Sequence, residues 1–218
     1  MSIKLHYQTV KPILRTVLDT LMAMPKFEPF RLVGGTSLSL RYGHRMSDDI
    51  DLFTDAEYRS LDFHHLQDTL RKTFAYCSGD CGDIVGFGSS YIVGNSADDA
   101  VKLDLFYTDT FIKSVSTVDN IRLASVDDIV AMKVDVIGRG GRKKDFWDLH
   151  LLHDKYSIEQ MLDLHQQRYP YSHDAEEIMR GFTAFENADL APDPNCLQQK
   201  VWQLIKLDFT EWLDNPKG

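Results

Sequence analysis

The sequence predicts a mixed α/β fold, with a β-sheet flanked by helices over residues 1–124 and a helical bundle over residues 125–218. Short apolar or alternating runs bounded by turn residues, at 50–53 and 101–106, are typical of strands. After Tyr156 the apolar residues recur at helical spacing almost to the end of the chain. Hydrophobic residues make up 43% of the 218 residues, which is enough for a sizeable core.

The first part of the chain alternates helices and strands. An amphipathic helix is expected over residues 6–23, with Pro12 near its start, where proline is tolerated. A core strand at 30–33 and a helix at 60–76 follow. Two short apolar runs around glycines and serines predict a hairpin at 83–94.

The second part of the chain begins with a capping signature. Ser125 precedes a helix predicted at 126–138, and Asp128, three residues on, completes a pattern that resembles a capping box. A second helix begins near Lys143, and further helices are expected near 157–168, 173–187 and 197–213. The last helix is predicted to bury a stripe made of Val201, Leu204, Ile205, Phe209 and Trp212.

Residues 32–53, LVGGTSLSLRYGHRMSDDIDLF, read as a strand, a glycine turn, a short helix, a loop and a second strand. Gly34 and Gly35 carry no Cβ, so the backbone can turn tightly and approach a ligand closely. Thr36 and Ser37 follow where a helix would begin, and the free N–H groups of a helix start favour an anion such as phosphate.

Three aspartates lie in predicted strands. Asp49 and Asp51 alternate with apolar residues and therefore share one strand face. Paired carboxylates repel each other unless a cation lies between them, and oxygen ligands suit Mg²⁺ bound with phosphates. Asp104 is a lone acid in the strand at 101–106, where it shares a face with Lys102 and is placed as a third metal ligand. The alternative is a solvated edge strand beside an ordinary glycine turn.

These motifs together resemble a known superfamily. Val33-Gly34-Gly35, thirteen residues, then Asp49-Ile50-Asp51-Leu52 is similar to the pattern of DNA polymerase β-like nucleotidyltransferases. GGTSLSL…GHRMSDDIDLF, with KLDLF and AMKVDVIGRGGRKKDFWDLHLL further on, resembles the AbiEii/AbiGii toxin group. The resemblance implies a nucleotidyltransferase core over 1–124 and a helical domain over 125–218 that completes the nucleotide cleft.

The resemblance also implies roles for individual residues. Asp49, Asp51 and Asp104 would hold two Mg²⁺ ions, and Lys133 would reach the triphosphate as a point charge. Residues expected to contact the nucleoside triphosphate are Gly34, Gly35, Thr36, Ser37, Arg45, Lys144, Asp145 and Asp148. The superfamily more often has serine where this chain has Gly35. A lysine at the border of an apolar helix face can also simply extend to solvent, which is the alternative for Lys133.

The function implied is that of a toxin of a type IV toxin–antitoxin or phage-defence (abortive infection) system. Such a toxin uses a nucleoside triphosphate and Mg²⁺ to modify an acceptor, which is tRNA in some members, and a neighbouring gene encodes its antitoxin. Two alternatives stay open: a small-molecule nucleotidyltransferase of the antibiotic-modifying type, and a catalytically inactive binding protein on the same fold. The three intact aspartates count against the inactive protein.

Composition limits the partners and the compartment. The net charge of −9 is unlike that of a nucleic-acid coat protein, although an enzyme can meet RNA through a local basic patch. Arg139, Arg142, Lys143 and Lys144 form such a patch, or else a solvated loop. Three cysteines and an N-terminus unlike a secretory signal favour a reducing, cytoplasmic location, and no apolar run is long enough to span a membrane.

Overall fold

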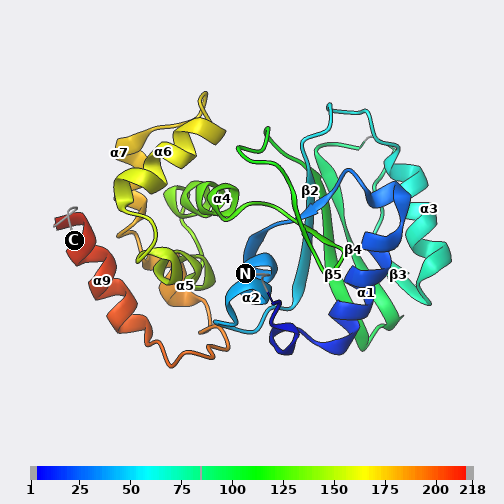
Figure 1. Ribbon diagram of the computed structural model, residues 1–218, viewed down its shortest axis with the longest axis horizontal. Coiled ribbons are helices and arrows are strands. Elements are labelled where there is room, and N and C mark those ends of the chain that lie inside the picture. The colour runs from blue at the N-terminus through cyan, green and yellow to red at the C-terminus, as the bar shows by residue number, and fades with distance from the viewer. Residues whose placement is uncertain (1–3, 84, 215–218) are drawn as a thin grey trace. The chain divides into compact units, whose positions relative to one another are not determined.

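The computed structural model describes residues 4–83 and 85–214, which fold into two compact units (Figure 1). We call the first the sheet unit; it contains the chain up to Gly43, Ser47–Thr110 and Ser114–Ala124. We call the second the helical unit; it contains His44–Met46, Phe111–Lys113 and the chain from Ser125 onward.

Strands of the described residues form one seven-stranded mixed sheet in the order β3-β4-β5-β2-β1-β7-β6. Their bounds are β1 Arg31–Leu32, β2 Asp49–Thr54, β3 Tyr76–Ser78, β4 Gly88–Ser96, β5 Asp99–Tyr107, β6 Ser116–Val118 and β7 Ile121–Leu123. Strand β2 runs parallel to β5, and β1 runs parallel to β7, while the other neighbours are antiparallel. The predicted mixed sheet is confirmed, and the parallel pair β2–β5 lies at its centre.

Helices α1 (Pro12–Ala23) and α3 (Phe63–Thr73) pack on one face of this sheet, and α2 (Gly34–Tyr42) leads into β2 (Figure 1). Two short 3₁₀ helices, Tyr7–Thr9 and Pro25–Phe27, flank α1. Helix α1 starts at Pro12 rather than at residue 6, because proline at the first helical position has no N–H to leave unpaired. Burial alternates along β2, so its apolar residues join the core on the α1 side and its aspartates face the other way.

The helical unit contains α4 (Val126–Gly138), α5 (Lys143–Leu152), α6 (Ile158–Arg168), α7 (Ala175–Gly181), α8 (Glu186–Leu190) and α9 (Trp202–Asp214). Phe146 of α5 packs edge-on against Phe209 and Trp202 of α9, which fixes these two helices together. The segment His44–Met46 joins this unit through two backbone hydrogen bonds: Met46 N–H to the Asn195 carbonyl, and Leu197 N–H to the His44 carbonyl. No helix of the described residues is both long and apolar enough to cross a membrane.

Part of the predicted element pattern is wrong around residue 88. Residues 83–94 do not form a hairpin; residue 84 lies outside the described residues, and Gly88–Ser96 is one continuous strand paired with β5. Its residues alternate between buried and exposed through Ser89 and Ser90, so these serines belong to the strand rather than to a turn. The hairpin turn lies instead between β4 and β5.

The predicted C-terminal helices also need correction. The helix expected at 173–187 is two helices, α7 and α8, and α7 ends at Gly181, where an added Cβ would lie 2.7 Å from the Gly138 Cα. Val201 and Leu204 are exposed, because α9 begins at 202 and its buried stripe is limited to Trp202, Ile205 and Phe209.

Ser125 caps α4 as predicted, by accepting a hydrogen bond from the Asp128 N–H. The Asp128 carboxylate does not complete a capping box. It is fully buried and accepts hydrogen bonds from the Ile112 N–H and the Arg168 guanidinium. Asp128 therefore ties the segment Phe111–Lys113 to the helical unit.

Candidate functional site

The three predicted metal-binding aspartates lie on one face of two neighbouring strands. The parallel pairing of β2 with β5 sets Asp51 opposite Asp104 and Asp49 opposite Lys102. Paired strands lie about 4.8 Å apart, so the three carboxylates project from neighbouring backbone positions. The apolar residues between them are buried in the opposite face. The strand register therefore places the three acids on one face of neighbouring strands, and their role as metal ligands stays a prediction.

Both oxygens of the Asp104 carboxylate bond to side chains of the sheet unit. The Ser90 hydroxyl of β4 donates to Oδ1 at 2.6 Å, and the Lys102 ammonium lies 2.5 Å from Oδ2. Sequence reasoning missed Ser90 as a site residue. It placed Lys102 on the Asp104 face but gave it no role, although a lysine two residues before an acid in a strand is the signal for such a pair.

Gly34 approaches the carboxylate of Asp51. Its φ is +66°, in the left-handed region, and a Cβ added there would lie 2.6 Å from Asp51 Oδ2. Beside it, the Val33 N–H donates to the Asp51 carbonyl at 2.9 Å. The glycine turn at the start of α2 and the second aspartate therefore fit together only because residue 34 has no side chain.

Thr36 links the start of α2 to the start of β2. Its hydroxyl is buried, donates to the Asp49 carbonyl at 2.5 Å and lies 2.7 Å from the Ser47 hydroxyl. Within the described residues the buried Ser37 hydroxyl has no hydrogen-bond partner. Thr36 thus positions the backbone of Asp49, while a contact of either hydroxyl with a phosphate stays a prediction.

The residues fit a hard divalent cation by the chemistry of their donors. Asp49, Asp51 and Asp104 offer only carboxylate oxygens, which is the ligand type that Mg²⁺ takes beside substrate phosphates. In the described residues no three acidic, histidine or cysteine side chains are already grouped closely enough to hold a metal. The Asp104 carboxylate is held by Lys102 and Ser90 instead.

Lys133 lies in a buried ionic network of the helical unit. Its ammonium is 2.6 Å from Asp145 Oδ1 and 2.8 Å from Asp148 Oδ2, and all three side chains are less than 10% exposed. Burial alone would lower the pKa of Lys133, but the charges of Asp148 and Asp145 outweigh it and raise that pKa. Lys133 therefore neither extends to solvent nor lies free beside a ligand, and its contact with a triphosphate stays a prediction.

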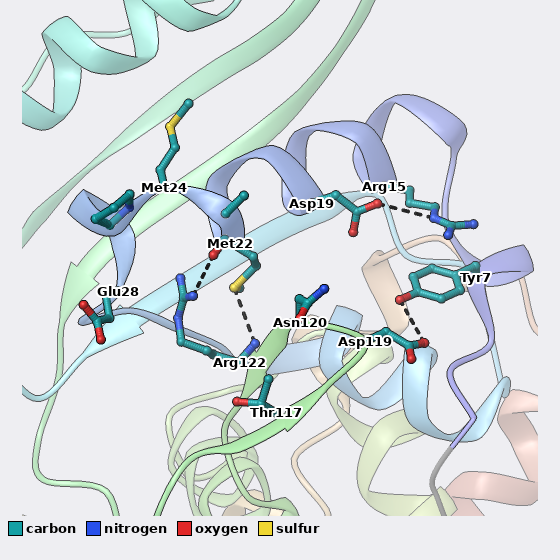
Figure 2. Close-up of a pocket in the computed structure, with 12 residues that line it drawn as sticks. Tyr7, Arg15, Asp19, Met22, Met24, Glu28, Thr117, Asp119, Asn120 and Arg122 are labelled. Carbon is teal, nitrogen blue, oxygen red and sulfur yellow. Dashed lines mark hydrogen bonds and ion pairs between the residues drawn. The ribbon is translucent and has the colours of Figure 1, made fainter.

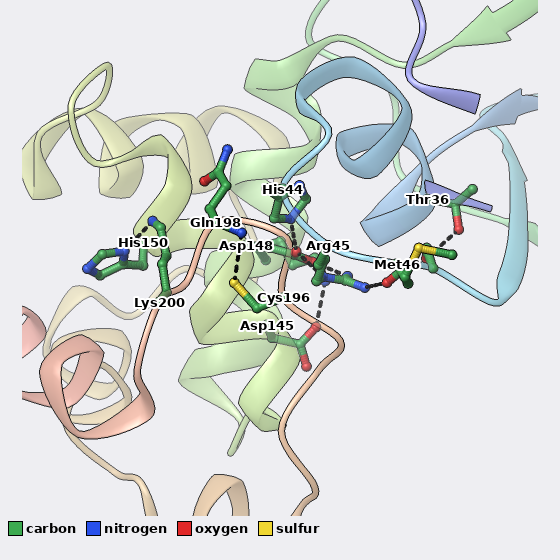
Figure 3. A network of polar contacts seen from close by, with 12 residues as sticks. Thr36, His44, Arg45, Met46, Asp145, Asp148, His150, Cys196, Gln198 and Lys200 are labelled. Atoms are coloured by element: carbon green, nitrogen blue, oxygen red, sulfur yellow. Dashed lines mark hydrogen bonds and ion pairs between the residues drawn. The ribbon is translucent and has the colours of Figure 1, made fainter. Parts of the chain in front are cut away.

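Asp148 is the centre of this network (Figure 3). Arg45 donates to both of its oxygens, at 2.7 and 2.8 Å, and the His44 ring contacts it at 2.8 Å. Burial alone would raise the pKa of Asp148, but the charges of Lys133 and Arg45 hold it well below its ordinary value. Burial also lowers the pKa of His44, despite its bond to Asp148. The predicted residues Arg45, Lys133 and Asp148 are thus brought together, and sequence reasoning missed His44.

The predicted basic patch divides into buried and exposed members. The Lys143 side chain is 8% exposed and pairs with Asp193 at 2.8 Å. Arg139 and Arg142 are 71% and 66% exposed, and Lys144 is half-buried in the first turn of α5. The Asp145 carboxylate caps α5 by accepting from the Arg142 N–H at 3.0 Å. Only the two arginines therefore present extended charge to solvent.

A separate cavity of about 790 Å³ lies beside the end of α1 (Figure 2). Arg122 lines this cavity and donates to the Met22, Phe27 and Phe30 carbonyls. The Tyr7 hydroxyl donates to Asp119, and both residues also line the cavity (Figure 2). None of the predicted site residues lines this cavity. The candidate site therefore rests on strand register and close approach rather than on the volume of a cavity.

The family assignment follows from a comparison with known families. The sequence profile described as "Nucleotidyl transferase AbiEii toxin, Type IV TA system" matches residues 16–215. The chain belongs to this family. The predicted family and enzyme class, nucleotidyltransferase, are thereby confirmed, and the profile spans both units.

Individual proteins are similar to this chain along most of its length. An uncharacterized protein of Aquifex aeolicus (strain VF5) is 28% identical over 211 residues, covering 92% of this chain and 96% of the relative. The crystal structure of a putative nucleotidyltransferase from H. pylori has a TM-score of 0.58 at 20% identity, covering 93% of this chain and 91% of that one. MenT4, a nucleotidyltransferase toxin of Mycobacterium tuberculosis H37Rv, has a TM-score of 0.55 at 12% identity, covering 93% and 83%. These structural likenesses show a shared nucleotidyltransferase fold.

Proposed function

We propose that this AbiEii-family protein transfers a nucleotide from a nucleoside triphosphate to an RNA acceptor, in particular tRNA, in a Mg²⁺-dependent reaction. The observation that carries the proposal is the register of β2 with β5, which sets Asp51 opposite Asp104 and keeps Asp49 on the same face. The glycine turn at Gly34 lies against the Asp51 carboxylate. A phosphate-binding turn beside three acids is the arrangement that phosphoryl-type transfer requires.

The sheet unit supplies the groups for the chemistry. Asp49 and Asp51 would hold Mg²⁺ together with the triphosphate, and the N–H groups at Gly34 and Gly35 would receive the phosphates. Asp104 would complete the metal site beside the attacking hydroxyl of the acceptor and accept its proton, as that hydroxyl bonds the α-phosphorus and pyrophosphate leaves. When bound, two Mg²⁺ ions would neutralise charge on the attacking and leaving oxygens.

The acceptor is proposed from charge and from the family. Arg139 and Arg142 are exposed cations at adjacent helix ends of an otherwise acidic chain, where a phosphate backbone could be contacted. Membership of a type IV toxin family implies that expression without its antitoxin arrests growth. We therefore propose that an antitoxin encoded by a neighbouring gene is the protein partner.

The experiment is incubation of the purified protein with each labelled nucleoside triphosphate, Mg²⁺ and total RNA. We expect label in RNA for the wild type and none for Asp51→Asn, which removes a carboxylate without disturbing the strand. Label on a small molecule but not on RNA would favour the antibiotic-modifying alternative. Absence of transfer to any acceptor, with the Asp51→Asn protein indistinguishable from wild type in Mg²⁺–nucleotide binding, would refute the proposal.

A further inference from the structure

Lys102 lies on the same face of β5 as Asp104 and contacts its carboxylate. In the β2–β5 register it lies opposite Asp49, and along β5 it is two residues before Asp104, so its side chain emerges among the acids on their shared face. Its ammonium lies 2.5 Å from Asp104 Oδ2. A lysine is thus placed where the proposed reaction needs a divalent cation.

The charges around Lys102 support this placement. The ammonium bonds one Asp104 oxygen, and the strand register sets Lys102 directly opposite Asp49. Its positive charge therefore offsets part of the repulsion between the Asp104 carboxylate and the acids of β2.

We propose that Lys102 is the internal cation of this cluster, whose ammonium occupies the Asp104 carboxylate and must leave it before a divalent ion can bind there. This inference rests on the proposed function, because it assigns the metal site to Asp49, Asp51 and Asp104. Lys102 is then a positioning residue that sets how tightly the third carboxylate binds metal.

The contact is built to be reversible. The Lys102 side chain is 46% exposed, and the Asp104 side chain is 16% exposed, so the ammonium can move into water at little cost. Its flexible stem allows that movement without a change in the strand. The Ser90 hydroxyl holds the other carboxylate oxygen and keeps Asp104 oriented after the ammonium has left.

The test measures Mn²⁺ binding to the full chain without nucleotide, by calorimetry and by the electron paramagnetic resonance of free Mn²⁺. Lys102→Met should bind Mn²⁺ about tenfold more tightly than wild type, because a unit charge a few Å from a divalent ion is removed. Lys102→Arg, which keeps the charge, should stay within about twofold of wild type. Lys72→Met, which removes an exposed lysine of α3, controls for the change in net charge.

A double-mutant cycle with Asp104→Asn locates the effect. If Lys102 acts through Asp104, Lys102→Met should give no gain in affinity in the Asp104→Asn background. Wild-type affinity in Lys102→Met, with Mn²⁺ binding still lost in Asp51→Asn, would overturn this inference and leave the proposed function standing. Failure of Mn²⁺ to bind to wild type and to Lys102→Met, with no nucleotide transfer by either, would overturn both.

Discussion

Replacing Lys133 with methionine should destabilise the helical unit. The ammonium is the shared partner of two buried carboxylates, Asp145 at 2.6 Å and Asp148 at 2.8 Å. Methionine keeps most of the side-chain volume, so the change removes the charge without opening a large cavity. Buried carboxylates that lose a cation stay in a low-dielectric environment with uncompensated charge.

The magnitude follows from what each carboxylate keeps. Asp148 retains two hydrogen bonds from Arg45, whereas Asp145 retains the Arg142 N–H and a guanidinium 3.5 Å away that is 66% exposed. In the variant, therefore, Asp145 is the carboxylate left without a buried cation beside it. Breaking a buried ion pair from one side costs about 3–5 kcal/mol, and because one carboxylate stays paired we expect about 3 kcal/mol.

Tryptophan fluorescence in urea can measure this loss in the right part of the molecule. All three tryptophans, Trp147, Trp202 and Trp212, belong to the helical unit. The midpoint should fall while the slope with urea stays unchanged, because a similar surface is exposed on unfolding. The exposed Lys155 provides the control, since Lys155→Ala should change the free energy of unfolding by less than about 0.5 kcal/mol.

A second variant tests the cause. Adding Asp145→Asn to Lys133→Met removes the unbalanced charge and should restore at least about 1 kcal/mol. If Lys133→Met is as stable as the Lys155→Ala control, or if the double variant is less stable than the single one, the reasoning from unpaired charge is refuted. Neither the solvent-exposed nor the triphosphate-contacting role expected for Lys133 from sequence predicts a loss of stability.

Gly34→Ala should cost at least about 1 kcal/mol of stability and reduce nucleotide transfer about tenfold or more, since the added Cβ meets Asp51 Oδ2 at 2.6 Å and the φ of +66° disfavours alanine. Thermal melting and single-turnover transfer measure the two effects. Gly86→Ala is the control, because its new Cβ meets nothing within 4 Å. Equal losses of stability and transfer in Gly34→Ala and Gly86→Ala would contradict the steric argument. Burial lowers the pKa of His44, so the unfolded chain binds a proton at this histidine more readily than the folded chain does. The stability that neutral His44 contributes is therefore fully present above the ordinary histidine pKa. It declines as the pH falls below that value toward the lowered pKa of the folded state. His44→Gln should therefore lose less stability than wild type between pH 7 and pH 5 in tryptophan-monitored urea titrations, and parallel pH dependences would contradict that assignment.

The sheet could be predicted largely because its strands follow a local rule. Apolar and polar residues alternate in β2 and β5, and this period alone places Asp49 and Asp51 together on the polar face of β2 and Asp104 on the polar face of β5. Which strands are neighbours is not local information. The pairing of β2 with β5 depends on contacts across about fifty residues of chain, so sequence could name the three acids but not set Asp51 opposite Asp104.

The contacts of the buried ionic network are tertiary and could not be predicted from the sequence, although Arg45, Lys133 and Asp148 were named as site residues and only His44 was missed. His44 and Arg45 lie in a loop between α2 and β2, and nothing in their sequence neighbourhood shows that both contact Asp148. The sequence predicts Lys133 at the border of an apolar helix face, whereas its side chain is buried. Lys133 is buried because it pairs with Asp145 and Asp148 of α5. The spacing of residues within α4 alone does not show which side chains of another helix lie beside it.

The geometry proposed for catalysis is set mainly by backbone contacts. Gly34 fits against the Asp51 side chain, the Val33 N–H bonds the Asp51 carbonyl, and the Thr36 hydroxyl bonds the Asp49 carbonyl. A shift in the start of α2 must therefore move both aspartates, because each is tied to a different residue of that turn. Conversely, a change confined to the Asp104 contacts alters charge without moving α2, since Ser90 and Lys102 belong to β4 and β5. Variants at the turn should thus impair stability and transfer together, whereas variants at Lys102 should change metal affinity alone.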